Sequence, residues 1–117
     1  MSFNFENLNR KNTVREGIDT TILEFKPLKD FLGQTIRCDG FFFNEGKFGR
    51  QVVVVGTNIV NETFLINMPA RAVEQFDKIN ENESALNAML EGKMCIKDIK
   101  MKDTKNGTTT IYNFGNI

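Results

Sequence analysis

The sequence contains no histidine and no tryptophan, and only two cysteines and two prolines among its 117 residues. Without histidine the chain lacks the commonest general base and the commonest metal ligand, which excludes Ser-His and Cys-His nucleophile pairs. Cys38 and Cys95 lie far apart and form no Cys-x-x-Cys motif. We therefore expect no zinc site and no redox pair, but two small buried thiols in a reducing, cytoplasmic compartment.

Long apolar runs are also missing, because no segment approaches the roughly 18 consecutive apolar residues of a membrane-spanning helix. The first residues lack both a basic region and a long apolar region, so no signal peptide is expected. Hydrophobic residues make up 40% of the chain, and its 15 basic residues balance its 15 acidic ones. This composition predicts one folded domain over residues 18–117, preceded by a polar, flexible arm over residues 1–17.

Alternating apolar residues and turn signals predict five strands. They are expected over residues 35–43, 50–56, 63–68, 93–102 and 108–114. A further short strand is expected within residues 18–26, where Pro27 ends it. Glycine-containing turns over 44–49 and 103–107 predict two hairpins, and a change of alternation predicts a β-bulge near Lys97 and Asp98.

Helical spacing of apolar residues predicts one helix from Pro69 to Asn80 and a second from Glu83 to Glu91. The helical segment therefore follows the third of the five strands. This order predicts a mainly β fold, namely a five-stranded OB-fold Greek-key barrel with a helical segment between the third and fourth strands. A four-stranded α+β sandwich is the competing architecture, but it would normally interleave two helices with its strands.

The charge is unevenly distributed along the chain. Residues 62–91 carry six acidic and two basic side chains, whereas residues 92–105 carry five lysines and two aspartates. Single-strand binding needs cations along the backbone path and ring faces on which unpaired bases stack. In an OB-fold, the first and last hairpins lie around one binding face. The candidate nucleic-acid-binding residues are therefore Arg37, Phe41, Phe43, Lys47, Phe48, Arg50, Lys100, Lys102, Lys105 and Tyr112.

Each of these signals has a structural alternative. The lysines of 93–105 would also suit the solvated face of an edge hairpin, where lysine discourages aggregation. Phe41 and Phe43 face outward only if the alternation continues past Gly40, and a bend at Gly40 would reverse their direction. Phe48 at the hairpin tip would either stack on a ligand or cover the barrel as a lid.

Several segments together resemble a known family. They are Gly40-Phe41-Phe42-Phe43-Asn44, Gly46-Lys47-Phe48-Gly49-Arg50-Gln51, Ile66-Asn67-Met68-Pro69-Ala70-Arg71, Gly92-Lys93 and Thr104-Lys105-Asn106-Gly107-Thr108-Thr109. In order and spacing, over roughly residues 28–117, the chain resembles the small single-stranded DNA-binding proteins of bacteriophages and prophages of Gram-positive bacteria, such as those of lactococcal phages. The resemblance implies an OB-fold, single-stranded DNA as ligand, a role in replication or recombination in a bacterial cytoplasm, and a homodimer or higher oligomer.

One feature departs from bacterial single-stranded DNA-binding proteins, because residues 112–117 do not form an acidic, disordered tail. Replication or recombination proteins are candidate partners, but the sequence does not predict their recruitment through such a tail. The alternative function is an OB-type protein-interaction module in which exposed phenylalanines form a partner surface. An enzyme is not expected, because Asp98 and Asp103 lie among five lysines, and we expect neither a metal nor another cofactor.

Overall fold

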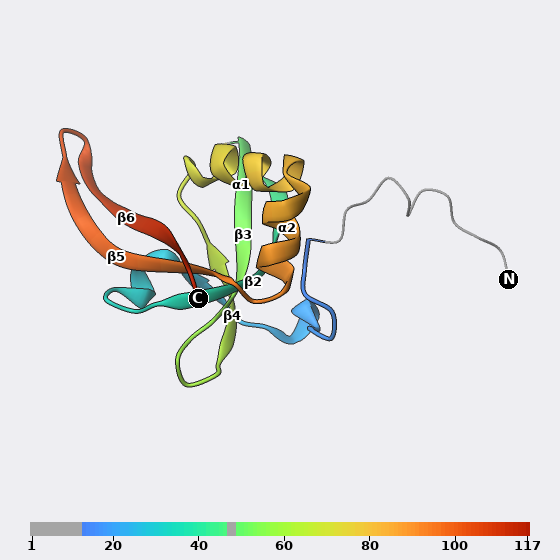
Figure 1. Ribbon diagram of the computed structural model, residues 1–117. Coiled ribbons are helices and arrows are strands. Elements are labelled where there is room, and N and C mark those ends of the chain that lie inside the picture. Colours follow the sequence, from blue (N-terminus) through green and yellow to red (C-terminus); the bar gives the residue numbers. More distant parts are fainter. Residues whose placement is uncertain (1–12, 47–48) are drawn as a thin grey trace, which may run out of the picture.

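The computed structural model describes residues 13–46 and 49–117. This part of the chain forms one six-stranded sheet with the order β1-β4-β3-β2-β5-β6 (Figure 1). β1 runs parallel to β4, and the other neighbouring strands are antiparallel. The strands are β1 (Phe25–Pro27), β2 (Ile36–Gly46), β3 (Gly49–Thr57), β4 (Thr63–Asn67), β5 (Met94–Thr104) and β6 (Gly107–Asn116).

Two α-helices connect β4 to β5. They are α1 (Ala72–Glu81) and α2 (Glu83–Leu90), and the side chain of Asn82 between them accepts a hydrogen bond of 3.1 Å from the amide of Ala85. This contact satisfies one of the amides that the start of α2 would otherwise leave unpaired. After α2, Gly92 takes a left-handed backbone conformation with φ of 78°, which ends the helix and starts β5. In the described residues no helix is long and apolar enough to cross a membrane.

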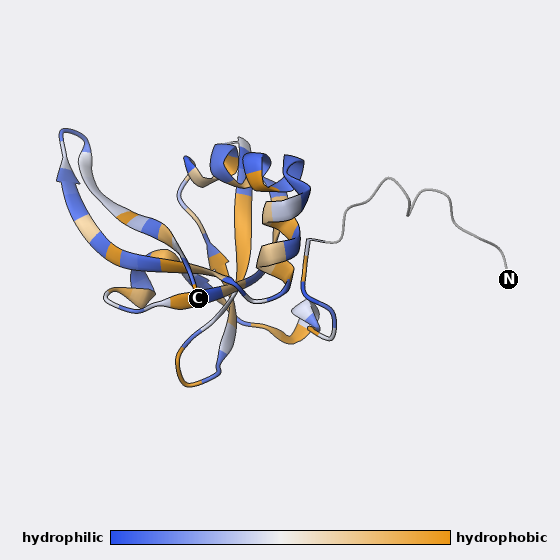
Figure 2. Cartoon of the chain, viewed as in Figure 1, coloured by the Kyte–Doolittle hydropathy of each residue, from blue (hydrophilic) through white to orange (hydrophobic). Residues whose placement is uncertain are grey.

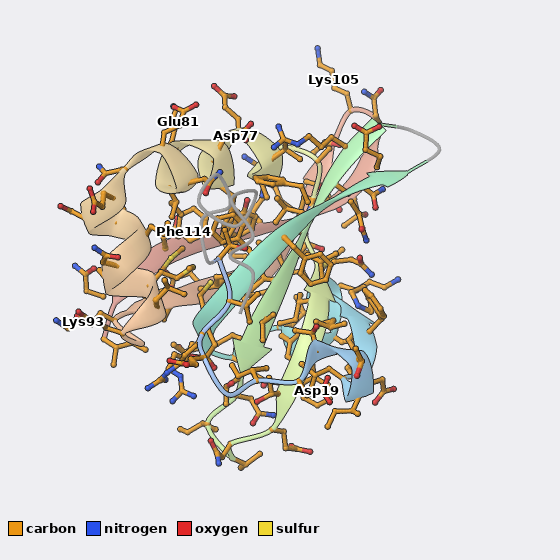
Figure 3. The ribbon with its side chains drawn as sticks, turned by 90° about the vertical axis from the view of Figure 1, so that its right-hand side faces the viewer. Asp19, Asp77, Glu81, Lys93, Lys105 and Phe114 are labelled. Atoms are coloured by element: carbon orange, nitrogen blue, oxygen red, sulfur yellow. The ribbon has the colours of Figure 1, made fainter. Side chains whose placement is uncertain are left out.

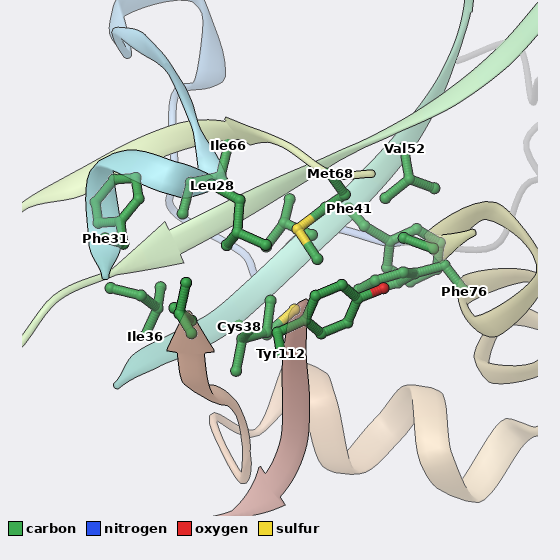
Figure 4. Packing of buried hydrophobic residues seen from close by; sticks show 14 of the residues in the cluster. Leu28, Phe31, Ile36, Cys38, Phe41, Val52, Ile66, Met68, Phe76 and Tyr112 are labelled. Atoms are coloured by element: carbon green, nitrogen blue, oxygen red, sulfur yellow. The ribbon is translucent and has the colours of Figure 1, made fainter. Parts of the chain in front are cut away.

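The main hydrophobic core lies between the helices and the sheet. Phe41 of β2 and Phe76 of α1 are both fully buried there, with ring centroids 4.9 Å apart (Figure 4). Leu86 and Met89 of α2 and Ile96 of β5 belong to the same cluster. Burial of these side chains joins helices and sheet into one unit.

A second cluster covers the opposite side of β3 and β4. Val53 and Val55 of β3 pack there with Leu65 of β4 beneath residues of the segment 14–23. Because β3 is covered on both sides, the four consecutive valines from Val52 to Val55 are all fully buried. Figure 2 shows the hydrophobic stretch of β3. A strand with both faces covered loses the alternation of a half-exposed strand.

The sheet confirms the mainly β class and the five strands expected from the sequence, although their ends differ by a few residues. The expected five-stranded barrel is wrong in its strand count, because the short N-terminal strand, Phe25–Pro27, pairs with β4 and makes the sheet six-stranded. The helices consequently follow the fourth strand of the chain. Only the last part of the strand expected within 18–26 forms, because Thr20–Ile22 is a 3-10 turn in which Asp19 accepts from the amide of Thr21 at 3.0 Å. The helix expected from Pro69 begins at Ala72, whose amide donates to the carbonyl of Pro69.

Candidate nucleic-acid interface

The β5–β6 hairpin extends away from the rest of the sheet (Figure 1). β5 pairs with β2 only through Ile96 and Cys95, and beyond them its ladder is with β6 alone. The predicted bulge is confirmed, because the register shifts between Lys97 and Lys100, where Asp98 has φ of 52°. All residues from 101 to 108 are exposed, so this hairpin presents both of its faces to solvent.

Three predicted cations lie on this hairpin. Lys100 and Lys102 are two residues apart beyond the bulge and therefore share one face of β5. Lys105 lies in the turn between Thr104 and Gly107, at the end of the molecule shown uppermost in Figure 3. All three are exposed, and none forms an ion pair with another residue of the described chain. Their charges are available to a ligand.

Arg50 has a partner inside the protein. Its guanidinium forms two contacts with the Asp77 carboxylate of α1, at 3.0 and 3.1 Å, and lies 3.8 Å from the ring centroid of Phe43. Phe43 is half-buried and meets the edge of Phe41 with a centroid distance of 5.6 Å. Because Asp77 compensates the charge of Arg50, this arginine is not a free cation. Its guanidinium instead offers a partly exposed flat surface. Lys47 and Phe48, predicted at the tip of this hairpin, lie outside the described residues.

Phe41 and Tyr112, although predicted as interface residues, lie in the core. The register of β2 shifts between Cys38 and Gly40, so the extra residue Asp39 turns Phe41 and Phe43 toward the helices. Phe41 is fully buried, and the partly buried Phe42 packs on the other side of the sheet. The bend considered at Gly40 is present, and the ring of Phe41 is closed to a base.

Tyr112 is 9% exposed, and its hydroxyl donates to Oε1 of Gln75 in α1. Burial raises the pKa of Tyr112, and the nearby guanidinium of Arg71 opposes this effect. Arg71 lies 5.1 Å from the tyrosine ring centroid and donates to the carbonyl of Thr110 at 2.8 Å. These contacts join the start of α1 to β6, so Tyr112 and Arg71 hold the hairpin in place.

Arg37 lies at the opposite end of β2 from the hairpin turn. Its Nε and Nη2 donate to the two oxygens of Asp39 at 2.7 and 3.1 Å, and this carboxylate raises the pKa of the guanidinium. Asp39 is fully buried and also contacts Arg15 at 3.5 Å and the hydroxyl of Thr57 at 2.5 Å. The structure therefore separates Arg37 from the predicted lysines and places it in a second polar cluster.

Asp39, Arg71 and Phe25 are structural features that were not among the predicted site residues. Phe25 of β1 is 54% exposed, an unusual position for a large apolar ring, and the adjacent Lys26 lies 5.3 Å from the ring centroid of Phe64. An aspartate inside an apolar strand pattern is a sequence signal for a buried ion pair, because an isolated buried carboxylate is costly. No local pattern marks Phe25 as exposed.

Within residues 13–46 and 49–117, no three Cys, Asp or Glu side chains are grouped closely enough to hold a metal ion. The chain matches no family model, no curated protein and no solved structure. Any functional conclusion therefore depends on the geometry described above.

Proposed function

We propose that this protein binds single-stranded DNA without strong sequence preference, through the β5–β6 hairpin and the adjoining start of β3. The observation that carries this proposal is the set of three exposed, unpaired lysines, Lys100, Lys102 and Lys105, on a projecting hairpin. Cations along a strand are suited to successive phosphates of a flexible polynucleotide. The role in phage or prophage replication or recombination, and assembly into a homodimer or higher oligomer, are part of this proposal.

The order of the strands supports an OB-type barrel as the scaffold. Without β1, the sheet order is β4-β3-β2-β5-β6, with the helices between β4 and β5. A partly open five-stranded Greek-key barrel has its two hairpins at the first and last strand pairs, as β2–β3 and β5–β6 are here. β1 would then be an addition at the β4 edge. The same fold can serve unrelated functions, so the charged hairpin and not the strand order is the physical support for binding.

A single strand suits this surface better than a duplex does. Duplex binding depends largely on neutralising many phosphates, whereas this chain has no net charge and few free cations at the interface. Arg50 and Phe43 add a stacked guanidinium and ring. Asp77, the partner of Arg50, lies toward the same end of the molecule as Lys105 (Figure 3). Unpaired bases can stack on such planar groups.

The test is fluorescence anisotropy with labelled poly-dT, using a variant with Lys100, Lys102 and Lys105 all changed to Gln. Three phosphate contacts predict a slope of about −2 for log affinity against log salt, and the variant should lose most of this slope. The matched control changes Lys29, Lys78 and Lys93 to Gln, which removes the same charge from other exposed sites. The control should bind within about twofold of wild type, because distant exposed charges are screened.

Equal weakening by both triple variants would place the binding surface elsewhere, and no binding by the wild type would contradict the function itself. In that second case the protein-interaction alternative gains support from Ile22 and Phe25, which are 78% and 54% exposed. Analytical ultracentrifugation of the double variant Ile22→Ser, Phe25→Ser would then show whether these side chains hold an assembly together.

A further inference from the structure

A pocket of about 690 Å³ opens where β2 begins and β3 ends. Its lining includes Gln34, Thr35, Arg37, Ile59, Asn61 and Ile117. Its volume is in the range of small-molecule sites, which bring a few polar groups together on an otherwise apolar wall. The pocket is separate from the proposed interface, because Ile96 pairs beside it with Ile36, whereas Lys100, the nearest of the three lysines, is four residues further along β5, about 13 Å away.

The polar side of this pocket includes the guanidinium of Arg37, and a second guanidinium, that of Arg15, lies beside Gly92 in its wall. Asp39 is fully buried and binds both Arg37 and Arg15, so one carboxylate faces two guanidinium groups. Both arginines lie against Gly92 in the pocket wall, because a Cβ built there would be 3.1 Å from Nη1 of Arg15 and 3.5 Å from Cδ of Arg37. The flanking Glu91 and Lys93 pair with each other at 2.8 Å.

Arg37 is held in place and still has donors to offer. Its Nε and Nη2 are bound to Asp39, while its Nη1 makes no hydrogen bond with another described residue. The side chain remains 37% exposed. A guanidinium whose orientation is fixed by a buried carboxylate loses little entropy when it binds an anion.

The apolar side of the pocket includes two isoleucine side chains that are largely exposed. Ile59 is 94% exposed and Ile117 is 69% exposed, and both line the pocket. The loop that carries Ile59 is held by Asn58, whose side chain accepts from the amides of Val60 and Glu62 at 3.2 and 2.8 Å. A flat apolar group between these two side chains would remove their surfaces from water.

We propose that this pocket binds a nucleotide that carries a phosphate monoester, with the phosphate on Arg37 and Arg15 and the base against Ile59 and Ile117. Arginine suits phosphate because it offers several donors in a fixed plane. The side-chain amides of Gln34 and Asn61 can both donate to and accept from the edge of a base. A free mononucleotide and the phosphorylated end of a strand have this same chemistry.

The experiment is an amide NMR titration of the full chain with dTMP, thymidine and inorganic phosphate as separate probes. dTMP should shift the amides of Gly33, Thr35, Asn61 and Gly92, and both other probes should bind about tenfold or more weakly because each lacks half of the contacts. Arg37→Gln should weaken dTMP about ten- to a hundredfold, the range for losing a charged hydrogen bond. Inorganic phosphate binding as tightly as dTMP, or dTMP shifting none of these amides, would overturn the proposal.

Arg37→Gln also removes a partner of buried Asp39 and can therefore destabilise the fold. A second pair of variants tests the site without disturbing Asp39. Ile59→Asp and Ile59→Asn differ only in charge at an exposed position. The aspartate should bind dTMP at least about threefold more weakly than the asparagine, because it adds a negative charge to the wall of the pocket that also holds the phosphate. Equal affinity of the two variants would place the phosphate elsewhere.

Oligothymidylates with a 5′-phosphate or a 5′-hydroxyl distinguish the two sources of the ligand. If the phosphorylated strand binds more tightly, the ligand of the pocket is a strand end. If both strands bind equally and dTMP binds in its own titration, the ligand is a free nucleotide. The variant lacking Lys100, Lys102 and Lys105 should retain its affinity for dTMP. The proposal for the pocket and the proposal for the DNA interface can therefore be refuted separately.

Discussion

Asp39 is the extra residue in β2 that sets which of the strand's side chains enter the main core. The extra residue shifts the register between Cys38 and Gly40, so Cys38 and Phe41 both enter the main core. The buried carboxylate at the bulge is compensated by Arg15, Arg37 and Thr57. A bulge that leaves an acid inside the protein requires such partners, because an unpaired buried charge costs several kcal/mol.

Phe41→Ala should lower the free energy of unfolding by about 3 to 5 kcal/mol, because it removes a ring from a filled core. The matched substitution Phe25→Ala should change it by less than about 0.5 kcal/mol, since that ring is largely exposed. Urea titrations of the two variants measure the difference directly. Similar losses for both would contradict the burial assigned to Phe41.

At the scale of elements, the segment 13–23 acts as a cover for the outer side of the sheet. Val14 forms a bridge with Gly40, and the amide of Phe41 donates to the carbonyl of Thr13 at 2.8 Å. Ile18 and Leu23 then pack on the cluster of Val53, Val55 and Leu65. The short β1 follows and extends the sheet beyond β4. These contacts give the residues before β2 a defined place on the sheet.

Gly40→Ala should loosen this cover, because the added Cβ would lie 2.6 Å from Cα of Val14 and 2.8 Å from the carbonyl oxygen of Thr13. We expect a loss of about 1 to 3 kcal/mol, as for other overpacked sites. Hydrogen exchange should become faster at the amides of Arg15 and Phe41, while amides of the β5–β6 hairpin serve as the internal control. Unchanged exchange at Arg15 would show that the segment does not depend on this contact.

For the whole molecule, the absence of histidine and the burial of Cys38 determine how stability responds to pH. No side chain with an ordinary pKa between about 5 and 8 is present, so stability should be nearly constant across that range. Burial raises the pKa of the Cys38 thiol from 9.0 to about 12. Above pH 9 the unfolded chain therefore releases a proton that the folded protein retains, and stability falls as the pH rises toward 12.

Urea titrations from about pH 7 to pH 11 should show this alkaline loss of stability, and Cys38→Ala should show a shallower loss. The comparison is between slopes, because removing the thiol also changes the core. Tyr112 has a raised pKa and remains in both proteins, so its contribution cancels. Identical slopes for the two proteins would mean that Cys38 ionises as readily in the folded state as in the unfolded state.

Local signals in the sequence were sufficient for most of the elements. Gly107 with φ of 118° closes the β5–β6 hairpin, and Gly92 ends α2, because these backbone conformations favour glycine wherever they occur. The bulge near Asp98 and the three exposed lysines of β5–β6 also follow from residues close together in the chain. Such features depend on neighbours in sequence, and the sequence by itself determined them.

Only the tertiary structure decided the remaining features of the candidate sites. The ion pair of Arg50 with Asp77 joins residues 27 positions apart, and the paired residues of β1 and β4 are 40 positions apart. The direction of Phe41 depends on one bulge, because a shift of one residue reverses every following side chain. These outcomes are set by which surfaces meet when the core closes, and that information is spread over the whole chain.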